Sequence, residues 1–295
     1  MKAERLTETI AYHGEGPVWF PSLRRLRCVD MLHGAILTLD PADSGSGLIG
    51  RDRVERTPVG SPIASVLRPR VGGGAVIATE SGISLARTDD LSDLTPAVEL
   101  FRDERLRTNE GGCDPEGRFY VGTMAYDRTE GAASVYRWDG PGSEPRTVIA
   151  PVTTSNGIDW SPDGKRAYYN DTPTMTVWAF DHDPATGLGR RRPWVTIDEH
   201  AGRPDGLCVD AEGGVWVALN KGSAVHRYAP DGTLSEIIDV PVHQVTACTF
   251  GGADLDQLFI TTSRENLEDH EEPAAGSVYV VRPGVRGLEA RPFAG

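Results

Sequence analysis

The stretch SNGIDWSPDGKRAYYND (155–171) contains the pattern that decides the fold. A short apolar run leads into a Pro-Asp-Gly turn, and a second run follows in which apolar and polar residues alternate. Alternation with a period of two is typical of half-buried β-strands, and Pro, Asp and Gly between two such runs mark a turn. The stretch therefore predicts two antiparallel strands joined by a tight turn.

The same pattern recurs along the chain. Similar turns are WFPSLRRL (19–26), LRPRVGGG (67–74), CDPEGR (113–118), WSPDGKR (160–166), VDAEGG (209–214) and FGGADLDQ (250–257). Strand-like runs follow them at 27–31, 75–79, 119–122, 167–170, 215–219 and 258–262. One reference residue per turn gives spacings of 48, 46, 47, 49 and 41 along the series Pro21, Pro69, Pro115, Pro162, Ala211 and Gly252.

Six strand-rich units of this length are typical of β-propeller blades, each a four-stranded sheet beside a central channel. A two-sheet sandwich is the alternative, but the near-equal spacing disfavours it. We therefore predict an all-β, six-bladed β-propeller in which residues 1–295 form one domain. We also expect the strand within 276–283 to join N-terminal residues in one blade, which would close the ring.

Composition excludes several other classes of protein. Of the 295 residues, 39% are hydrophobic and 25% are charged, which excludes disordered, collagen-like and coiled-coil chains. The net charge of −13 argues against a nucleic-acid partner, because phosphate contacts need Lys and Arg. The sequence has neither a membrane-spanning apolar run nor an apolar N-terminal signal core. Four separated cysteines without a CxxC pair favour reduced thiols, so we expect a cytoplasmic protein without membrane contact.

Polar residues share one position in most of the repeats. Six residues before the reference positions lie Glu15, Ile63, Asn109, Asn156, Asp205 and Thr246. Four of these side chains carry a carboxylate or a carboxamide, and equivalent positions in successive blades lie on one ring about the propeller axis. Such oxygens, converging at one channel mouth, are suitable ligands for a hard divalent cation. Asn and Asp before Gly are also ordinary turn residues, but the shared offset favours a metal site.

The chain resembles the regucalcin (senescence marker protein)/gluconolactonase family in five motifs that occur together. They are HGEGPVW (13–19), RTNEGGCDPEGRFYVGTM (107–124), SNGIDWSPDGKRAYYND (155–171), RPDGLCVDAEGGVWVA (203–218) and VTACTFGGADLDQLFITTS (245–263). The resemblance implies a six-bladed propeller with one divalent metal ion at the channel mouth. It also implies that Glu15, Asn156 and Asp205 are the metal ligands, and that Asp205 is the general base.

The resemblance further implies which residues contact the substrate. Arg107 and Asn109 match residues that contact substrate hydroxyls in family members. Asp127 lies where animal members carry an acidic substrate contact, although Asp is shorter than the Glu found there. A salt bridge to Glu104 or Glu110 is the alternative role for Arg107.

The family's typical reaction implies a divalent-metal-dependent hydrolase that opens a sugar lactone to the aldonic acid with metal-activated water. Oxygen ligands admit calcium, zinc, magnesium, manganese or iron(II), so the sequence leaves the metal open. Two alternatives remain: an organophosphate or non-sugar lactone hydrolase on the same scaffold, and a non-catalytic calcium-binding propeller. The pair Arg107 and Asn109 favours a polyol substrate. The sequence does not predict the oligomeric state.

Four further residues have open roles. His13 and His243 lie near predicted site positions, and for both we expect packing or support of the site rather than direct metal ligation. His200 precedes the RPDG motif in a loop that could edge the pocket. Lys221 either alters the specificity of the pocket or is a solvated surface charge. The acidic stretch 264–272 is expected to be a solvated loop or short helix between strands. The GxSxG motif of α/β-hydrolases is absent.

Overall fold

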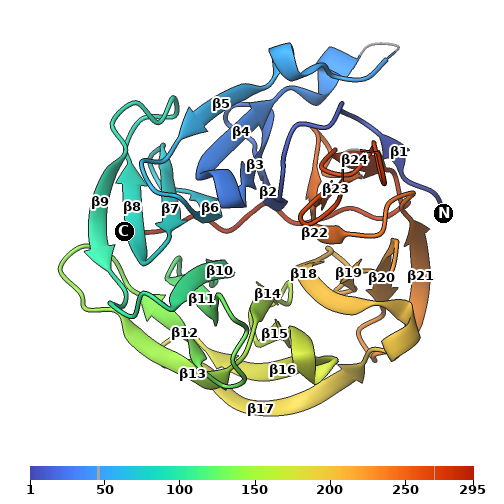
Figure 1. Ribbon diagram of the computed structural model, residues 1–295. Helices are drawn as coiled ribbons and strands as arrows, with labels where there is room; N and C mark the ends of the chain where they lie inside the picture. Colours follow the sequence, from blue (N-terminus) through green and yellow to red (C-terminus); the bar gives the residue numbers. More distant parts are fainter. Residues whose placement is uncertain (45–46, 269) are drawn as a thin grey trace.

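The computed structural model describes residues 1–44, 47–268 and 270–295. It contains six four-stranded antiparallel sheets, arranged as blades around a central axis (Figure 1). The prediction of an all-β, six-bladed propeller is therefore confirmed. The helices in the described part of the chain are short 3-10 turns: η1 (Met31–His33), η2 (Pro41–Ser44), η3 (Arg51–Arg53), η4 (Thr172–Thr174) and η5 (Glu199–Ala201).

Each blade starts at the channel and runs outward. The innermost strands are β2 (Gly14–Phe20), β6 (Ala64–Pro69), β10 (Leu106–Cys113), β14 (Ser155–Trp160), β18 (Arg203–Val209) and β22 (Val245–Gly251). The second strands are β3 (Arg25–Asp30), β7 (Ala75–Thr79), β11 (Phe119–Ala125), β15 (Arg166–Asp171), β19 (Val215–Asn220) and β23 (Gln257–Thr262). The predicted strand runs coincide with these second strands, except that Met31 already belongs to η1.

The outer half of each blade completes the sheet. The third strands are β4 (Ala35–Leu39), β8 (Gly82–Ala86), β12 (Ala133–Trp138), β16 (Thr176–Asp183), β20 (Ala224–Tyr228) and β24 (Tyr279–Val281). The outer strands are β5 (Glu55–Pro58), β9 (Thr95–Glu99), β13 (Arg146–Val152), β17 (Gly187–Thr196), β21 (Leu234–Asp239) and β1 (Glu4–Arg5). We number the blades 1 to 6 from the one that begins with β2 to the one that begins with β22.

The ring is closed by a blade that both ends of the chain build. The N-terminal strand β1 pairs antiparallel with β24, with Glu4 opposite Val280 and Arg5 opposite Tyr279. This pairing confirms the predicted closure. Because the N-terminal strand belongs to the last blade and the chain continues from it into β2 of the first blade, the ring cannot open without breaking this sheet.

The hydrophobic core lies mainly between neighbouring blades. Trp160 of blade 4, for example, packs edge-on against Tyr120 of blade 3, with ring centroids 5.2 Å apart. The C-terminal segment contacts the turns at one end of the blades, where Phe293 bridges to Arg70 and Gly287 to Asp210. The opposite end, where the innermost strands begin, is called the channel mouth below.

Two sequence expectations about the chain as a whole can be compared with the fold. The four cysteines are free, and three of them are buried. Among the described residues, no helix has the length and apolar character needed to cross a membrane.

Candidate metal centre and active site

Every innermost strand carries a β-bulge close to the channel mouth. In each blade the register between the innermost and the second strand shifts by one residue. The shifts lie within 15–18, 64–66, 108–111, 155–158, 204–207 and 245–247. A bulge takes residues out of the ladder and re-aims their side chains. Glu15, Asn109, Asn156 and Asp205 all lie at or within such a slip, so one repeated irregularity places them around the mouth.

Glu15 enters the site from β2 in blade 1. Its side chain is buried, and Oε2 accepts a hydrogen bond from the backbone N–H of Gly16 at 2.9 Å. Gly16 has a φ of +49°, a conformation that favours glycine, and an added Cβ would lie 3.2 Å from the carbonyl oxygen of Ser65. The glycine after Glu15 therefore allows the bulge that fixes the carboxylate.

A chain of hydrogen bonds joins the polar side chains of blades 3 and 4. Nη1 of Arg107 donates to Oδ1 of Asn109 at 2.7 Å, and Nδ2 of Asn109 donates to Oδ1 of Asn156 at 3.0 Å. Nδ2 of Asn156 in turn donates to Oγ1 of Thr172 at 2.7 Å. Thr172 then donates to the carbonyl oxygen of Pro204 in blade 5 at 2.8 Å. Two of the three predicted substrate contacts, Arg107 and Asn109, thus form one connected network with the predicted metal ligand Asn156.

Asp205 enters from β18 in blade 5 and is held by two asparagines from second strands. Its Oδ2 accepts a hydrogen bond from Nδ2 of Asn220 at 3.1 Å, and its carbonyl oxygen accepts one from Nδ2 of Asn170 at 2.7 Å. The residue that follows, Gly206, lies so close to blade 6 that an added Cβ would be 2.5 Å from the Cβ of Ala247. The carboxylate is therefore fixed by contacts on both sides of its strand.

Three buried carboxyl groups influence one another in the channel. Burial raises the pKa of Glu15 to about 7. Burial also raises the pKa of Glu110 well above its usual range, with a further contribution from the charge of Glu15. For Asp205, burial again comes first, and the charges of Glu15 and Glu110 raise its pKa further. The groups therefore need protons or a cation to remain buried together.

A divalent cation fits this arrangement. Glu15 and Asp205 supply carboxylate oxygens, and Oδ1 of Asn156 keeps one lone pair beyond its bond to Asn109. Oxygen ligands of this kind suit a hard cation, and its charge would offset the carboxylates. Oε2 of Glu110 is buried without a hydrogen-bond partner among the described residues, so an unsatisfied acceptor remains there.

Arg107 brings a buried positive charge to the same network. Its side chain lies in the protein interior, where Nη1 also contacts the sulfur of Met31 at 3.2 Å. Among the described residues it forms no salt bridge to Glu104 or Glu110, the alternative that the sequence left open. Nη1 also donates to the carbonyl oxygen of Thr108 at 3.0 Å. A guanidinium carries five N–H donors, so Arg107 keeps donors beyond those of Nη1.

His13 lies close to the site. Its Nδ1 is 2.7 Å from Oγ of Ser263, and the side chain is mostly buried. Burial, followed by the charge of Arg107, lowers the pKa of His13 to about 3, so the ring is neutral at physiological pH. A supporting role for His13 stays a prediction.

The remaining predicted residues lie outside the network. Oδ1 of Asp127 accepts hydrogen bonds from the backbone N–H and hydroxyl of Thr129, at 3.0 and 2.7 Å, in an exposed turn. His200 and Lys221 are exposed, and His243 pairs with Glu272 on the surface. The acidic stretch 264–272 lies between β23 and β24, and no helix is present in its described part.

Several site residues were not found from the sequence. Glu110 follows Asn109 directly, and a search that takes one residue from each repeat misses it. Asn170 and Asn220 come from the second strands β15 and β19, at the same end as the bulges. Both lie near the end of a second strand, so a comparison of the second strands of the repeats could have identified them.

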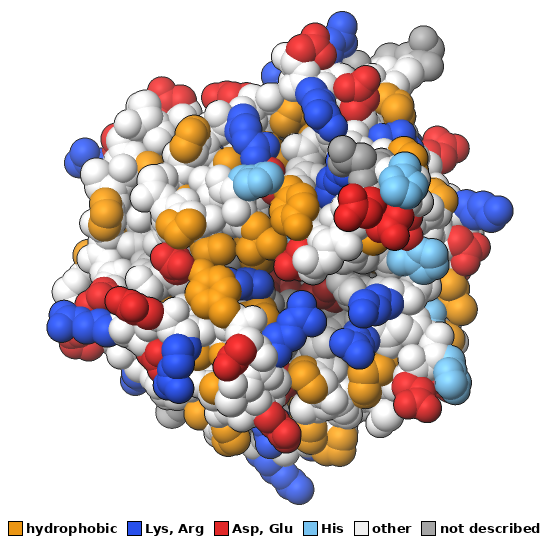
Figure 2. All heavy atoms as spheres, viewed as in Figure 1, with side chains coloured by type: hydrophobic (Ala, Val, Ile, Leu, Met, Phe, Trp, Pro, Cys, Tyr) orange, Lys and Arg blue, Asp and Glu red, His pale blue; other side chains and the backbone are white. Residues whose placement is uncertain are grey.

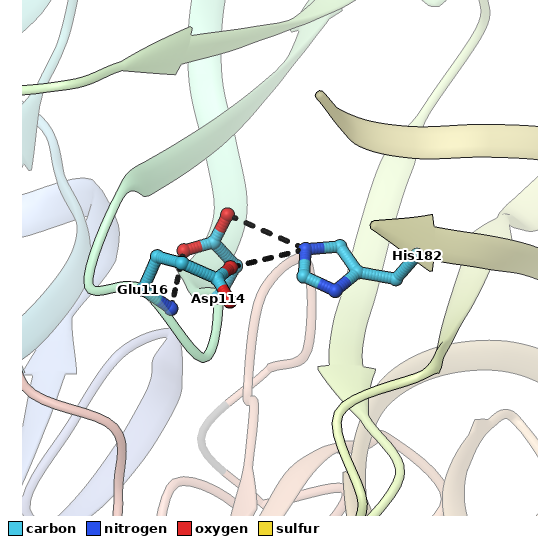
Figure 3. Close-up of side chains that lie close together, drawn as sticks. All are labelled: Asp114, Glu116 and His182. Carbon is cyan, nitrogen blue, oxygen red and sulfur yellow. Dashed lines mark hydrogen bonds and ion pairs between the residues drawn. The ribbon is translucent and has the colours of Figure 1, made fainter. Parts of the chain in front are cut away.

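A second group of potential metal-binding atoms lies at the other end of the blades. Asp114, Glu116 and His182 bring their ligand atoms within 4.8 Å of one another (Figure 3). The guanidinium of Arg118 already donates to Asp114 at 2.5 Å and to Glu116 at 2.8 Å, and lies 3.3 Å from Nε2 of His182. Because the Arg118 guanidinium already binds both carboxylates, we interpret the group as a link between blades 3 and 4.

Viewed as in Figure 1, the surface is hollowed near the centre of the ring, where acidic, basic and apolar side chains meet (Figure 2). The fold is a six-bladed propeller with buried carboxyl, amide and guanidinium groups near the channel mouth. The chain belongs to the family described as SMP-30/Gluconolactonase/LRE-like region, whose model matches residues 13–264. The resemblance inferred from the motifs is thus confirmed.

Individual relatives extend over the whole chain. The putative sugar lactone lactonase YvrE of Bacillus subtilis is 33% identical over 303 residues, which cover 100% of this chain and 99% of that protein. Regucalcin of Bos taurus is 31% identical over 307 residues, with 100% and 99% coverage. Among solved structures, the calcium-binding protein regucalcin from Agrobacterium tumefaciens superposes with a TM-score of 0.90 at 28% identity, covering 100% of this chain and 98% of that one.

Proposed function

We propose that this chain is a divalent-metal-dependent lactonase that hydrolyses a sugar lactone to its aldonic acid. Membership of the gluconolactonase family supports lactone hydrolysis. Three observations support the proposal: Glu15, Asn156 and Asp205 are buried on the innermost strands of three blades, Arg107 is joined to Asn156 through Asn109, and the charges of Glu15 and Arg107 act on Asp205. Carboxylate and amide oxygens would hold the cation, and the arginine would hold the substrate.

The residues of the chain have distinct roles in this proposal. A divalent cation held by Glu15, Asn156 and Asp205 would supply Lewis acidity to the lactone carbonyl and to water. Asp205 accepts the proton of the attacking water and returns it to the ring oxygen as the ester bond breaks. Because Asn220 holds Oδ2 of Asp205, Oδ1 is the oxygen assigned to this proton transfer.

Arg107 and Asn109 orient the substrate. The donors that Arg107 keeps would bind ring hydroxyls and stabilise the negative charge that develops on the carbonyl oxygen. Both N–H groups of Asn109 are used, on Ser155 and Asn156, so its Oδ1 is the atom assigned to a substrate hydroxyl. Asp127 as a substrate contact stays a prediction, as does a cytoplasmic location.

A calcium-binding propeller without catalysis is the second candidate. The Agrobacterium structure is described as a calcium-binding protein, and the ligand set of this chain would also suit calcium. Both candidate functions use the same metal site, so a measurement of turnover is needed to distinguish them.

Lactone hydrolysis by chelator-treated protein, with each divalent metal restored in turn, tests the proposal. A panel of five- and six-membered sugar lactones is followed by acid release, and the spontaneous rate is subtracted. We expect no turnover without metal and restored turnover with at least one cation. Metal binding without turnover on any sugar lactone would favour the binding propeller, and turnover of only apolar lactones or organophosphates would favour the other hydrolase class.

A further inference from the structure

A cavity of about 450 Å³ lies beside the channel mouth, between blades 1 and 6. Its walls come from three places that are distant in the sequence: the segment 9–12 that leads into β2, the outer part of blade 1, and the loop that follows β23. A volume of this size is within the range of small-molecule sites, which is about 300–1,000 Å³. None of the predicted metal ligands or substrate contacts lines it.

Three arginines line this cavity. Arg51 comes from η3, Arg56 from β5, and Arg264 from the loop after β23. Among the described lining residues, Asp30 is the one carboxylate, and Oε2 of Glu8 accepts the backbone N–H of Arg51 at 3.3 Å. The described lining residues thus include three guanidinium groups and one carboxylate, in a chain whose net charge is −13.

Two of the guanidinium groups are held in place by one hydrogen bond each. Nε of Arg51 donates to the carbonyl oxygen of Thr9 at 2.5 Å, and Nη2 of Arg56 donates to Oδ2 of Asp30. Asp30 is itself fixed, because its Oδ1 accepts the backbone N–H groups of Tyr12 and His13 at 3.0 Å each. Since a guanidinium has five N–H donors, both arginines are positioned and still have donors to offer.

The cavity also has apolar walls. Ile10, Tyr12, Leu37, Val54 and Leu267 contribute to the lining beside the arginines. Apolar and aromatic walls with a few fixed polar groups are the usual composition of a site for an organic ligand. A bare inorganic ion would leave most of this volume and surface unused.

We propose that this cavity binds a small organic anion, with the arginines on a carboxylate or phosphate group and the apolar walls against its carbon skeleton. Planar guanidinium groups match the oxygens of both anions and can bind them with paired hydrogen bonds. The site is separate from the metal centre, but Asp30 joins them through the backbone of His13, two residues before Glu15. The proposal does not rest on lactone turnover.

Titration calorimetry of the metal-loaded protein tests the site. The probes are gluconate, 6-phosphogluconate, inorganic phosphate and neutral glucose. The main variant is Arg51→Gln/Arg264→Gln, and Arg51→Lys/Arg264→Lys keeps the charge without the planar fork. Arg102→Gln is the matched control, because Arg102 is an exposed arginine paired with Glu99 away from the cavity.

We expect an organic anion to bind wild-type protein saturably and the control equally well. The glutamine variant should bind about tenfold more weakly, and added salt should weaken binding by the wild type. A preference for 6-phosphogluconate over gluconate would identify phosphate as the recognised group, and the reverse would identify carboxylate. Unchanged affinity in the glutamine variant would show that the anion binds elsewhere, such as at the metal, and would overturn the proposal. Two further results would overturn it: neutral glucose binding as tightly as the organic anions, or inorganic phosphate binding as tightly as every organic anion.

Discussion

The side-chain amide of Asn109 donates to Oδ1 of Asn156 at 3.0 Å, across the boundary between blades 3 and 4. Asn109 also accepts the hydrogen bond from Arg107, so a single side chain links the proposed substrate contact to the proposed metal ligand. Its neighbour Glu110 adds a third buried carboxyl group to Glu15 and Asp205. The bulge in β10 therefore contributes to both halves of the site.

Replacing Asn109 should damage metal binding and substrate binding together. Asn109→Ala removes the acceptor that holds Arg107 and the donor that holds Asn156. Because each lost buried hydrogen bond costs about 1–3 kcal/mol, we expect kcat/KM to fall about tenfold to a hundredfold. Steady-state kinetics and calorimetric metal titration measure the two effects. A variant with normal metal affinity and a raised KM alone would show that the link to Asn156 is unimportant.

Asp205→Asn should abolish most turnover while the propeller stays folded. The change keeps the shape of the side chain but removes the proposed base, so we expect kcat to fall about a thousandfold. Asp231→Asn is a matched control, since Asp231 is an exposed turn residue whose Oδ1 accepts from Thr233. Circular dichroism checks the fold of both variants. Near-wild-type turnover in Asp205→Asn would remove the assigned base.

Metal removal should destabilise the protein more as pH rises. Without the cation, the pKa of Glu15 is about 7 in the folded state against an ordinary value of 4.5, and those of Glu110 and Asp205 are also raised. At pH values between the ordinary and the raised pKa, the folded state binds more protons than the unfolded state. The free energy of unfolding of the metal-free protein therefore falls as pH rises. A bound cation replaces the protons and removes this loss.

The difference in Tm between metal-loaded and chelator-treated protein measures this effect. We expect the difference to widen from about pH 5 to about pH 8. In Glu15→Gln/Asp205→Asn, two of the three carboxyl groups are gone, so the difference should be small and nearly constant. A wild-type difference that narrowed with rising pH would contradict the assignment of these carboxylates to the cation.

Gly206→Ala should weaken both the fold and the metal centre. The added Cβ would meet Ala247 at 2.5 Å, so β18 and β22 must separate and Asp205 must move. Overpacking of this kind costs about 2 kcal/mol. Gly47→Ala is the control, because an added Cβ there has no neighbour within 4 Å among the described residues. Thermal unfolding and metal titration of the two variants make the comparison; equal behaviour would show that the close approach is not required.

The sequence predicted the fold because the turn chemistry repeats. Pro-Asp-Gly and related turns recur at a nearly constant spacing, and each turn joins a first strand to a second. Glu15, Asn156 and Asp205 could be found by one offset because the bulge lies at the same distance from each turn. In blade 2 the offset reached Ile63 instead of the bulge at Ser65. Pro69 is the last residue of β6 rather than a turn residue, so the count began two residues early.

Other parts of the site cannot be found by a search that takes one residue from each repeat. Glu110 points inward because the bulge turns two neighbouring residues out of the ladder, whereas strict alternation would place it opposite Asn109. Asn170 supports Asp205 from another blade. The arginine-lined cavity combines η3, β5 and the loop after β23, whose proximity follows only from the closed ring.

An anomalous difference map from crystals loaded with manganese(II) tests the central claim most directly. We expect one strong peak at the channel mouth, within ligand distance of oxygens from Glu15, Asn156 and Asp205. A peak at Asp114, Glu116 and His182 with none at the mouth would contradict the account, because the cation would then lie at the far end of the blades from Arg107.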